Sequence, residues 1–312
     1  MVYFQQAWIF GDQWFVFLLP DLGYYSLPNR IAGFLSVNWA PVEHAALVHC
    51  WIAFLLMLVP IAIVLFSEMD GLETPIRKVA AIAILTTLLP NNETWLSLAL
   101  SHFHQGLAVA LILASTSNRP WMTWFRFCFL LTAGLNSPFP GFFVPFFWLS
   151  WLVKRDRNKL VEAILLSLST AIQAWIVLAH SEQGIRQPNL NFEFLPYAIW
   201  IKQFVLSLTG WNSASLQVEE VRQAYLSGKS ALFWIVPIIY MVIAIALFWT
   251  KNISAILLFF SGIFVLFLST AYAIGVGDTH TYLVQIDTII AGRYYYVSAL
   301  LFYLCILTLC KP

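Results

Sequence analysis

Charged residues are scarce in this sequence. Only 10% of the 312 residues are Asp, Glu, Lys or Arg, and the 16 basic and 15 acidic side chains leave a formal net charge of +1. Soluble domains carry about 25% charged residues, so this composition excludes a soluble globular protein. No basic face and no block of like charge stands out along the chain. We therefore expect no nucleic-acid partner.

Cysteine is also rare, and its spacing gives no metal-binding pattern. Each cysteine lies within an apolar run: Cys50, Cys128, Cys305 and Cys310. We expect all of them to behave as small buried hydrophobic residues. Internal repeats, heptad seams and low-complexity tracts are likewise lacking, which excludes repeat and coiled-coil architectures.

Apolar residues dominate instead, at 61% of the chain with a mean hydropathy of +0.79. A helix that crosses a bilayer needs about 20 largely apolar residues. Clear runs lie at 45–66, 95–114, 160–179, 231–249, 253–274 and 293–310, and weaker ones at 79–89 and in the two halves of 121–153. Residues 136–141 divide those halves with turn-forming residues and predict a tight helical hairpin. We predict an all-α, polytopic membrane protein with about nine transmembrane helices.

Lysine and arginine residues in short loops orient these helices, because such residues concentrate on the cytoplasmic side. The hexapeptide 154–159 holds four cations and is placed in the cytoplasm. The loops with Arg77, Arg119, Lys251 and Lys311 then fall on the same side. The exterior side receives residues 1–43, 90–93, the Asn136 turn, 180–230 and 275–292.

This topology divides a single integral membrane domain, residues 1–312, into four parts. They are an exterior amphipathic loop (1–43), an N-terminal helical core (44–179), an exterior loop (180–230) and a C-terminal three-helix segment (231–312). Two helices are expected to lie in the plane of the membrane surface. One covers 27–35 and is entered through Pro28. The other covers 192–208, where apolar residues surround Lys202 and Gln203.

The first exterior loop offers acids and a cation. Asp12 and Asp21 lie among aromatic residues, where partial desolvation suits a carboxylate for a role as base or metal ligand. The alternative for each is a solvated loop acid or a helix cap. Arg30 suits bidentate contact with a lipid phosphate, or its guanidinium reaches out to the membrane surface from an apolar stem.

The second exterior loop carries Glu93 and leads into a helix with two histidines. Glu93 either interacts with the helix dipole or faces a cavity, since ionisable groups at membrane depth often mark a substrate path. His102 and His104 are two residues apart and point in nearly opposite directions from a helix. At most one of them belongs to a site.

The last exterior loop is the second concentration of polar residues. Asp278 and His280 are weak candidates for a metal or acid–base site. Arg293 stands at the start of a spanning helix beside Tyr294 and two more tyrosines. It is either part of an interfacial aromatic belt or a clamp on a phosphate group.

The order of several short motifs resembles a group of bacterial integral membrane proteins that look like members of the C-type (GT-C) glycosyltransferase superfamily. These motifs are Gly23-Tyr24-Tyr25, Pro28-Asn29-Arg30-Ile31, Ala40-Pro41, Pro90-Asn91-Asn92-Glu93-Thr94, Asn136-Ser137-Pro138, Gln173 and Gly292-Arg293-Tyr294-Tyr295. The resemblance implies an enzyme of the bacterial inner membrane that moves a sugar from a polyprenyl-phosphate carrier to an acceptor outside. It also implies membrane lipid as a partner.

The resemblance assigns roles to matching positions. The superfamily's catalytic acid lies in the first exterior loop; among the residues present here Asp12 is the substitute candidate for the base, with Glu93 as auxiliary acid or ligand. Arg30 and Arg293 contact the phosphate, and Tyr24, His102, Asn136 and Tyr294 contact substrate. Relatives of this kind sometimes hold a divalent metal, Mg²⁺ or Mn²⁺, for which Glu93, Asp278 and His280 are the candidates. A lipid-linked glycan flippase and a non-catalytic membrane protein are the alternatives.

In that family, a membrane span and an acidic pair precede the segment that resembles residues 2–7. Here Met1 takes the place where the acidic motif ends. Residues 1–10 contain no positively charged lead-in and no long apolar stretch, so no cleavable signal peptide is expected. We expect that the first transmembrane helix and the central acid lie upstream of this sequence.

Overall fold

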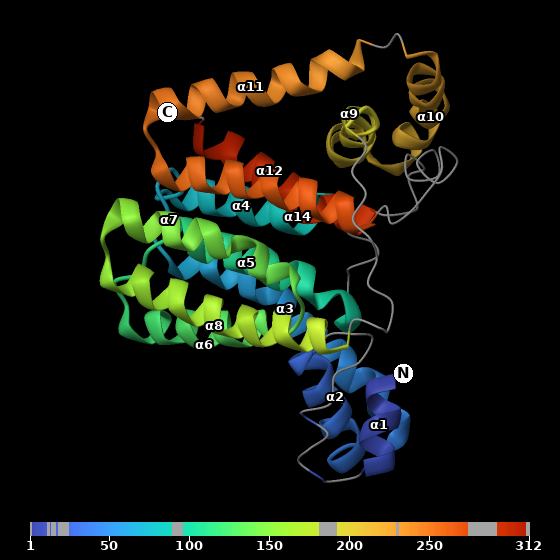
Figure 1. Cartoon of the computed structure of the whole chain (residues 1–312), viewed down its shortest axis with the longest axis vertical. Coiled ribbons are helices and arrows are strands. Elements are labelled where there is room, and N and C mark those ends of the chain that lie inside the picture. Colours follow the sequence, from blue (N-terminus) through green and yellow to red (C-terminus); the bar gives the residue numbers. More distant parts are fainter. Residues whose placement is uncertain are drawn as a thin grey trace. The chain divides into compact units, whose positions relative to one another are not determined.

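Every segment with regular structure in the computed structural model is helical (Figure 1). The structure describes residues 2–10, 13, 17, 25–88, 96–180, 192–228, 231–273 and 292–309, and these contain no β-strand. The chain separates into two compact units. Unit 1 comprises Met1–Ser67 and Thr94–Ile185, and unit 2 comprises Glu68–Glu93 and Arg186–Pro312. The all-α prediction is confirmed.

A helix occupies each apolar run that the sequence marks. The clear runs form α3 (Ala45–Phe66), α5 (Ser101–Ala114), α8 (Arg157–Ala179), α11 (Leu232–Thr250), α12 (Ile253–Ala273) and α14 (Gly292–Leu309), and the weaker ones form α4 (Pro75–Thr87), α6 (Pro120–Gly134) and α7 (Val144–Lys154). Among the described residues, 4 helices are long and apolar enough to cross a membrane, or up to 5 if a bent pair counts as one span. These helices indicate a membrane protein.

The bent pair is the region expected to form a hairpin. Helix α6 ends at Gly134 and the next helical turn, η4 (Phe139–Phe143), leads into α7. The two arms are bent by 119°. Pro138 lies between them and Pro140 lies in η4, and neither can donate a backbone hydrogen bond to a continuous helix. The predicted break is therefore present.

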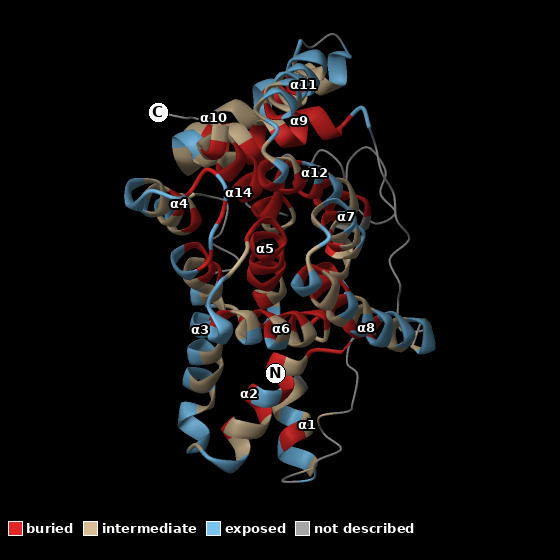
Figure 2. Cartoon of the chain, turned by 90° about the vertical axis from the view of Figure 1, so that its left-hand side faces the viewer, coloured by how far each residue is buried: buried red, intermediate tan, exposed pale blue. Residues whose placement is uncertain are grey.

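Helix α5 is the buried centre of unit 1. Every residue of α5 except His102 is buried, as Figure 2 shows. It packs against α3, α6 and η4, while α8 packs against α6 and α7. Gly106 permits the contact with η4, because a Cβ at this position would lie 2.2 Å from Cε1 of Phe139. Small residues allow such close approach between helices in membrane proteins.

Unit 2 is built around the packing of α12 against α14. Helix α4 also packs on α14, which explains why a segment placed in the N-terminal core by sequence belongs to unit 2. The turn before α4 is fixed to α12, because Ser254 Oγ donates to Asp70 Oδ2 at 3.0 Å and Asn252 Nδ2 donates to Asp70 O at 3.2 Å.

The segment 192–208 is helical, as expected, but it is not amphipathic. It comprises α9 (Leu195–Ile199), a π-helix η6 (Trp200–Val205) and the start of α10 (Leu206–Ser227). Lys202 and Gln203 are both fully buried, with Gln203 accepting a hydrogen bond from Tyr240 at 2.9 Å. A surface helix would expose these polar groups. The expected polar face is therefore packed inside unit 2.

The cysteines follow the sequence prediction only in part. Cys305 is buried, whereas Cys50 and Cys128 are exposed on the surface of the protein. Position 310 lies outside the described residues. An apolar helix that faces lipid exposes its apolar residues, so an apolar run does not by itself predict burial within the protein.

Close packing of α6 on α8 gives a test of the fold. A Cβ on Gly134 would lie 2.0 Å from Oγ and 2.7 Å from Cβ of Ser169. We expect Gly134→Ala to lower the free energy of unfolding by about 1–3 kcal/mol, as overpacking does in dense cores. Denaturant titration of the detergent-solubilised protein measures this loss.

The reciprocal exchange supplies the control. Adding Ser169→Gly to Gly134→Ala restores the space and should recover most of the stability. Gly262→Ala, where the nearest side-chain atom is Leu301 Cβ at 3.2 Å, should cost less. Equal losses for the Gly134 and Gly262 variants would contradict this packing.

Candidate functional site

Helix α2 (Leu27–Asn38) turns its polar residues inward. Its buried residues are Pro28, Asn29, Arg30, Ala32, Gly33 and Ser36. Proline near the first position suits a helix start, since the missing N–H is not needed there. Ile31 is 38% exposed, while Arg30 is 1% exposed. The expected helix is confirmed, but Arg30 is enclosed by protein and does not reach out to the surface.

Hydrogen bonds connect the start of α2 to the end of α6 and the start of α5. Ser26 Oγ donates to Asn136 Oδ1 at 2.6 Å and accepts from Asn29 Nδ2 at 2.7 Å. Asn136 Nδ2 in turn donates to Gln105 Oε1 at 2.6 Å and contacts Ser101 Oγ at 3.2 Å. We call these residues, together with Arg30 and Gln173, the Asn136 cluster.

Helix α8 joins the cluster through Gln173. Its Nε2 donates to the backbone oxygen of Tyr25 at 3.1 Å, and its buried Oε1 accepts no hydrogen bond within the described residues. An unsatisfied buried acceptor costs about 1–3 kcal/mol.

Burial raises the pKa of Tyr25, and the positive charge of Arg30 partly offsets this rise. The Tyr25 hydroxyl therefore stays protonated at neutral pH.

Arg30 links the cluster to α1 (Val2–Phe10). Its Nη1 donates to Gln6 Oε1, and its guanidinium lies 4.8 Å from the centre of the Tyr3 ring. Gly33 permits this approach, because a Cβ there would lie 2.8 Å from the carbonyl oxygen of Tyr3. The guanidinium therefore lies near an aromatic ring inside the protein and is not exposed to solvent.

The chemistry of the Asn136 cluster favours an anionic or hydroxyl-rich ligand. Its side chains are one arginine guanidinium, four amides and two serine hydroxyls. The amides belong to Asn29, Asn136, Gln105 and Gln173, and the hydroxyls to Ser26 and Ser101. Guanidinium groups bind phosphate in a bidentate manner, and a buried site strengthens this attraction through its low dielectric.

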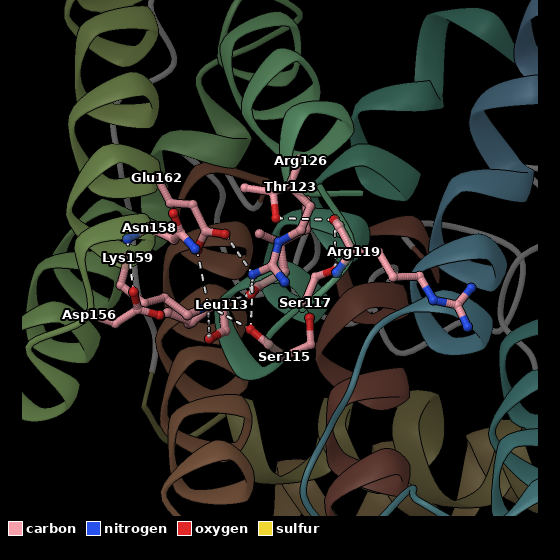
Figure 3. Close-up of polar contacts among 11 residues, drawn as sticks. Leu113, Ser115, Ser117, Arg119, Thr123, Arg126, Asp156, Asn158, Lys159 and Glu162 are labelled. Atoms are coloured by element: carbon pink, nitrogen blue, oxygen red, sulfur yellow. Dashed lines mark hydrogen bonds and ion pairs between the residues drawn. The ribbon is translucent and has the colours of Figure 1, made fainter. Parts of the chain in front are cut away.

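A second polar cluster holds the opposite end of α5 (Figure 3). Lys159 Nζ donates to the carbonyl oxygens of Ile112, Leu113 and Ser115 at 2.8, 3.1 and 2.7 Å. Arg126 Nη2 lies 2.8 and 2.9 Å from the oxygens of Ile112 and Ser115. Of these carbonyls, Ile112 O also accepts a bond from the backbone N–H of Ser115 at 3.3 Å. The last carbonyls of a helix lack i+4 donors, and cations are favoured at this end of its dipole.

Glu162 compensates the two buried cations. Its Oε1 lies 2.6 Å from Arg126 Nη2 and its Oε2 lies 3.0 Å from Lys159 Nζ, with all three side chains at most 2% exposed. The three hydrogens of the ammonium group are directed at the three carbonyls, so its contact with Glu162 is an ion pair. Arg119 lies nearby but points away from this group (Figure 3). We call Arg126, Lys159 and Glu162 the α5 anchor.

The structure brings together some of the residues expected in a site. Arg30 and Asn136 both belong to the Asn136 cluster. His102 lies on the same helix as Gln105 but faces Phe103 and Phe139, with ring centres 4.3 and 6.2 Å away. The expected residues Asp12, Tyr24, Glu93, Asp278 and His280 lie outside the described residues.

Arg293 and Tyr294 belong to unit 2. The guanidinium of Arg293 lies 5.1 Å from the centre of the Tyr294 ring, and its Nη2 donates to the Tyr294 hydroxyl at 3.4 Å. The side chain is partly exposed. This stacked pair fits either of the two interpretations given by the sequence.

Sequence reasoning missed the α5 anchor and part of the Asn136 cluster. Arg126 interrupts an apolar run, which is a signal of function or structure inside a membrane protein. Lys159 and Glu162 are spaced i, i+3, so they share one face of a helix. Ser26, Ser101 and Gln105 carry no comparable signal, since their partners are far away in sequence.

The described residues define an all-helical membrane protein with a buried arginine on α2 and a hydrogen-bonded polar cluster at the start of the same helix. Comparisons with protein-family models, characterised proteins and solved structures found no match to this chain. The described part of the chain also contains no group of three His, Cys, Asp or Glu residues placed to hold a metal ion. The expected metal ligands are outside it.

The α5 anchor predicts a large stability difference between buried and exposed ion pairs. Glu162→Gln leaves two buried cations uncompensated, and we expect a loss of about 3–5 kcal/mol in unfolding free energy. The matched control is Glu219→Gln, which breaks an exposed i, i+3 pair with Arg222 at 3.1 Å and should cost less than about 1 kcal/mol. Similar losses for both variants would contradict a structural role for the anchor.

The Asn136 cluster predicts a local effect on α2. Asn136→Leu removes the partners of Ser26, Ser101 and Gln105, so we expect faster amide hydrogen exchange in residues 27–38. Amide exchange in α8 should change little, because the ion pairs that hold this helix, at Lys159 and Glu162, do not involve Asn136. Asn38→Leu, which removes only a local bond to Phe34 O at 3.0 Å, is the control. Unchanged exchange in Asn136→Leu would show that the cluster does not hold α2.

Proposed function

We propose that the protein is a membrane glycosyltransferase, similar to the GT-C superfamily, that transfers a sugar from a polyprenyl-phosphate donor to a glycan or lipid acceptor. The observation that carries the proposal is the burial of Arg30 on α2, at the start of which the Asn136 cluster begins. Ionisable residues inside membrane proteins are costly and usually serve a ligand or a structural partner. The amide and hydroxyl groups of the cluster are of the kind that binds a sugar or a phosphate.

The proposed reaction inverts the configuration of the anomeric carbon. The acceptor oxygen forms a bond to that carbon while the bond to the phosphate oxygen breaks. A first-loop carboxylate, for which Asp12 is our candidate, takes the acceptor proton. Arg30 and Arg293 stabilise the negative charge on the departing polyprenyl phosphate. Asn136, Tyr24, His102 and Tyr294 orient the substrate, and Glu93 is an auxiliary acid.

We further propose a multi-pass arrangement with nine crossings of the bacterial inner membrane. The charge bias of the loops supports it, since five basic loops fall on one side under that count. Short helices such as α4, α5 and α6 then cross while packed within a bundle. The Asn136 cluster lies on the exterior side in this arrangement, where polyprenyl-linked sugars are used.

Substitution of Arg30 tests the proposal. In a deletion strain of the native host, we expect Arg30→Gln to lower sugar incorporation into the surface glycan by about 10²–10³-fold, comparable with loss of one charge-stabilising donor. Arg30→Lys keeps the charge but loses bidentate geometry and should give an intermediate value. Quantitative sugar analysis of the envelope measures both, and protein level in the membrane is measured in parallel.

Arg119→Gln is the matched control, because it removes the same charge from an exposed position. It should support wild-type incorporation. Normal incorporation with Arg30→Gln at normal protein level would overturn the proposal. An intact glycan with lipid-linked precursor accumulated inside the cell would instead support a flippase, a class that often contains broken helices such as α6–α7.

A further inference from the structure

Unit 2 contains an open pocket, and neither Arg293 nor Tyr294 is among the described residues that line it. It has a volume of about 580 Å³ and is bordered by Glu193, Tyr197, Tyr225, Gly228, Ala231, Phe233 and Trp234. These residues come from the segment that enters α9, the end of α10 and the start of α11. Ligand pockets commonly measure about 300–1,000 Å³, so this one has the size of a small organic ligand.

The pocket is lined by aromatic rings set at steep angles to each other. The rings of Tyr197 and Tyr225 lie 5.4 Å apart at 73°, and those of Phe233 and Trp234 lie 5.0 Å apart at 90°. Such edge-to-face pairs are a favoured geometry of aromatic side chains. Aromatic side chains from α9, α10 and α11 therefore border the pocket together.

One side of the pocket is rigid and the other is open. Tyr197 is 3% exposed and packs in an apolar cluster with Phe194, Ala198 and Val221. Phe194 also supports Tyr225, with ring centres 5.8 Å apart at 87°. In contrast, Trp234 is 66% exposed. A ligand would therefore find a preformed floor and an accessible indole ring.

Gly228 is one of the residues that border the pocket. It ends α10 with a φ of 64°, a left-handed conformation that favours glycine. An added Cβ would meet nothing within 4 Å. A residue with a side chain would therefore project into open space at the pocket edge.

We propose that this pocket binds a saccharide, the acceptor glycan if the proposed function holds. A sugar ring has a face of C–H bonds, which suits the negative faces of aromatic rings, and hydroxyl groups, which suit the Glu193 carboxylate and the tyrosine hydroxyls. An aromatic cage for an ammonium group needs the rings closed around a small cation. A volume of about 580 Å³ is much larger than such a cage requires.

Direct binding to the purified full-length chain in nanodiscs tests the pocket. The probes are unsubstituted trisaccharides of glucose, galactose, mannose and N-acetylglucosamine, and saturation-transfer NMR detects contact with their ring protons. We expect transfer to at least one probe. Trp234→Leu should weaken its affinity about tenfold, equivalent to about 1.4 kcal/mol, and Glu193→Gln should also weaken it.

Trp249→Leu is the matched control, because Trp249 is exposed on the other end of the same helix. It should leave affinity unchanged. No transfer to any probe, or equal losses in both tryptophan variants, would overturn the proposal. Binding of tetramethylammonium that depends on Trp234, without saccharide binding, would also overturn it.

This experiment is independent of the transfer reaction. If the protein binds a saccharide but its Arg30→Gln variant supports normal sugar incorporation, the pocket proposal stands and the proposed enzyme activity is rejected. Loss of incorporation in Arg30→Gln, without any saccharide binding at Trp234, would reject the pocket and retain the enzyme.

Discussion

The attachment of α5 at its carboxyl end is the interaction on which unit 1 depends. Helix α5 is almost completely buried, so the carbonyl groups at its end cannot be satisfied by water. Lys159 and Arg126, from α8 and α6, supply the missing donors, and Glu162 limits the excess positive charge. One set of contacts therefore fixes three helices at the same end. Buried charges are tolerated here because every charged side chain has a partner of opposite charge or a backbone carbonyl.

The opposite end of α5 is held differently. Ser101 and Gln105 near its start reach Asn136, which in turn reaches Ser26 before α2. These bonds are between neutral groups, each contributing about 0.5–1.5 kcal/mol, whereas the anchor is ionic. The Asn136 cluster also leaves the acceptor Oε1 of Gln173 unused within the described residues. The α5 anchor likewise holds buried polar atoms without a hydrogen bond in the described part of the chain, Arg126 Nε and Glu162 Oε2, so the two ends of α5 differ in the charge of their contacts rather than in how completely these are satisfied.

Sequence predicted the helices well because hydrophobic runs and proline breaks are local signals. The run 45–66 coincides with α3, and the break near Asn136 separates α6 from η4. The direction in which polar residues face was not predictable in the same way. The pattern around Arg30 indicates an amphipathic helix, but only its packing against α1 and α3 and the bond from Ser26 to Asn136 determine that its polar side is covered by protein. The sequence predicted Lys159 to lie in a basic loop. In the structure Asp156 caps α8, so that Lys159 lies in the first turn of this helix.

Burial in this protein therefore separates residues that look alike in sequence. Arg30, Arg126 and Arg119 are all arginines beside apolar runs, yet the first is buried on α2, the second pairs with a carboxylate inside unit 1, and the third is exposed. Amino-acid composition does not distinguish these arginines, and the positive-inside rule considers only the side of the membrane on which each one lies. Their neighbours differ: Glu162 pairs with Arg126 and holds it in the α5 anchor, whereas the guanidinium of Arg30 donates to Gln6 and lies against the ring of Tyr3. Residues that the sequence presents alike are therefore distinguished only by the side chains that tertiary packing brings to them.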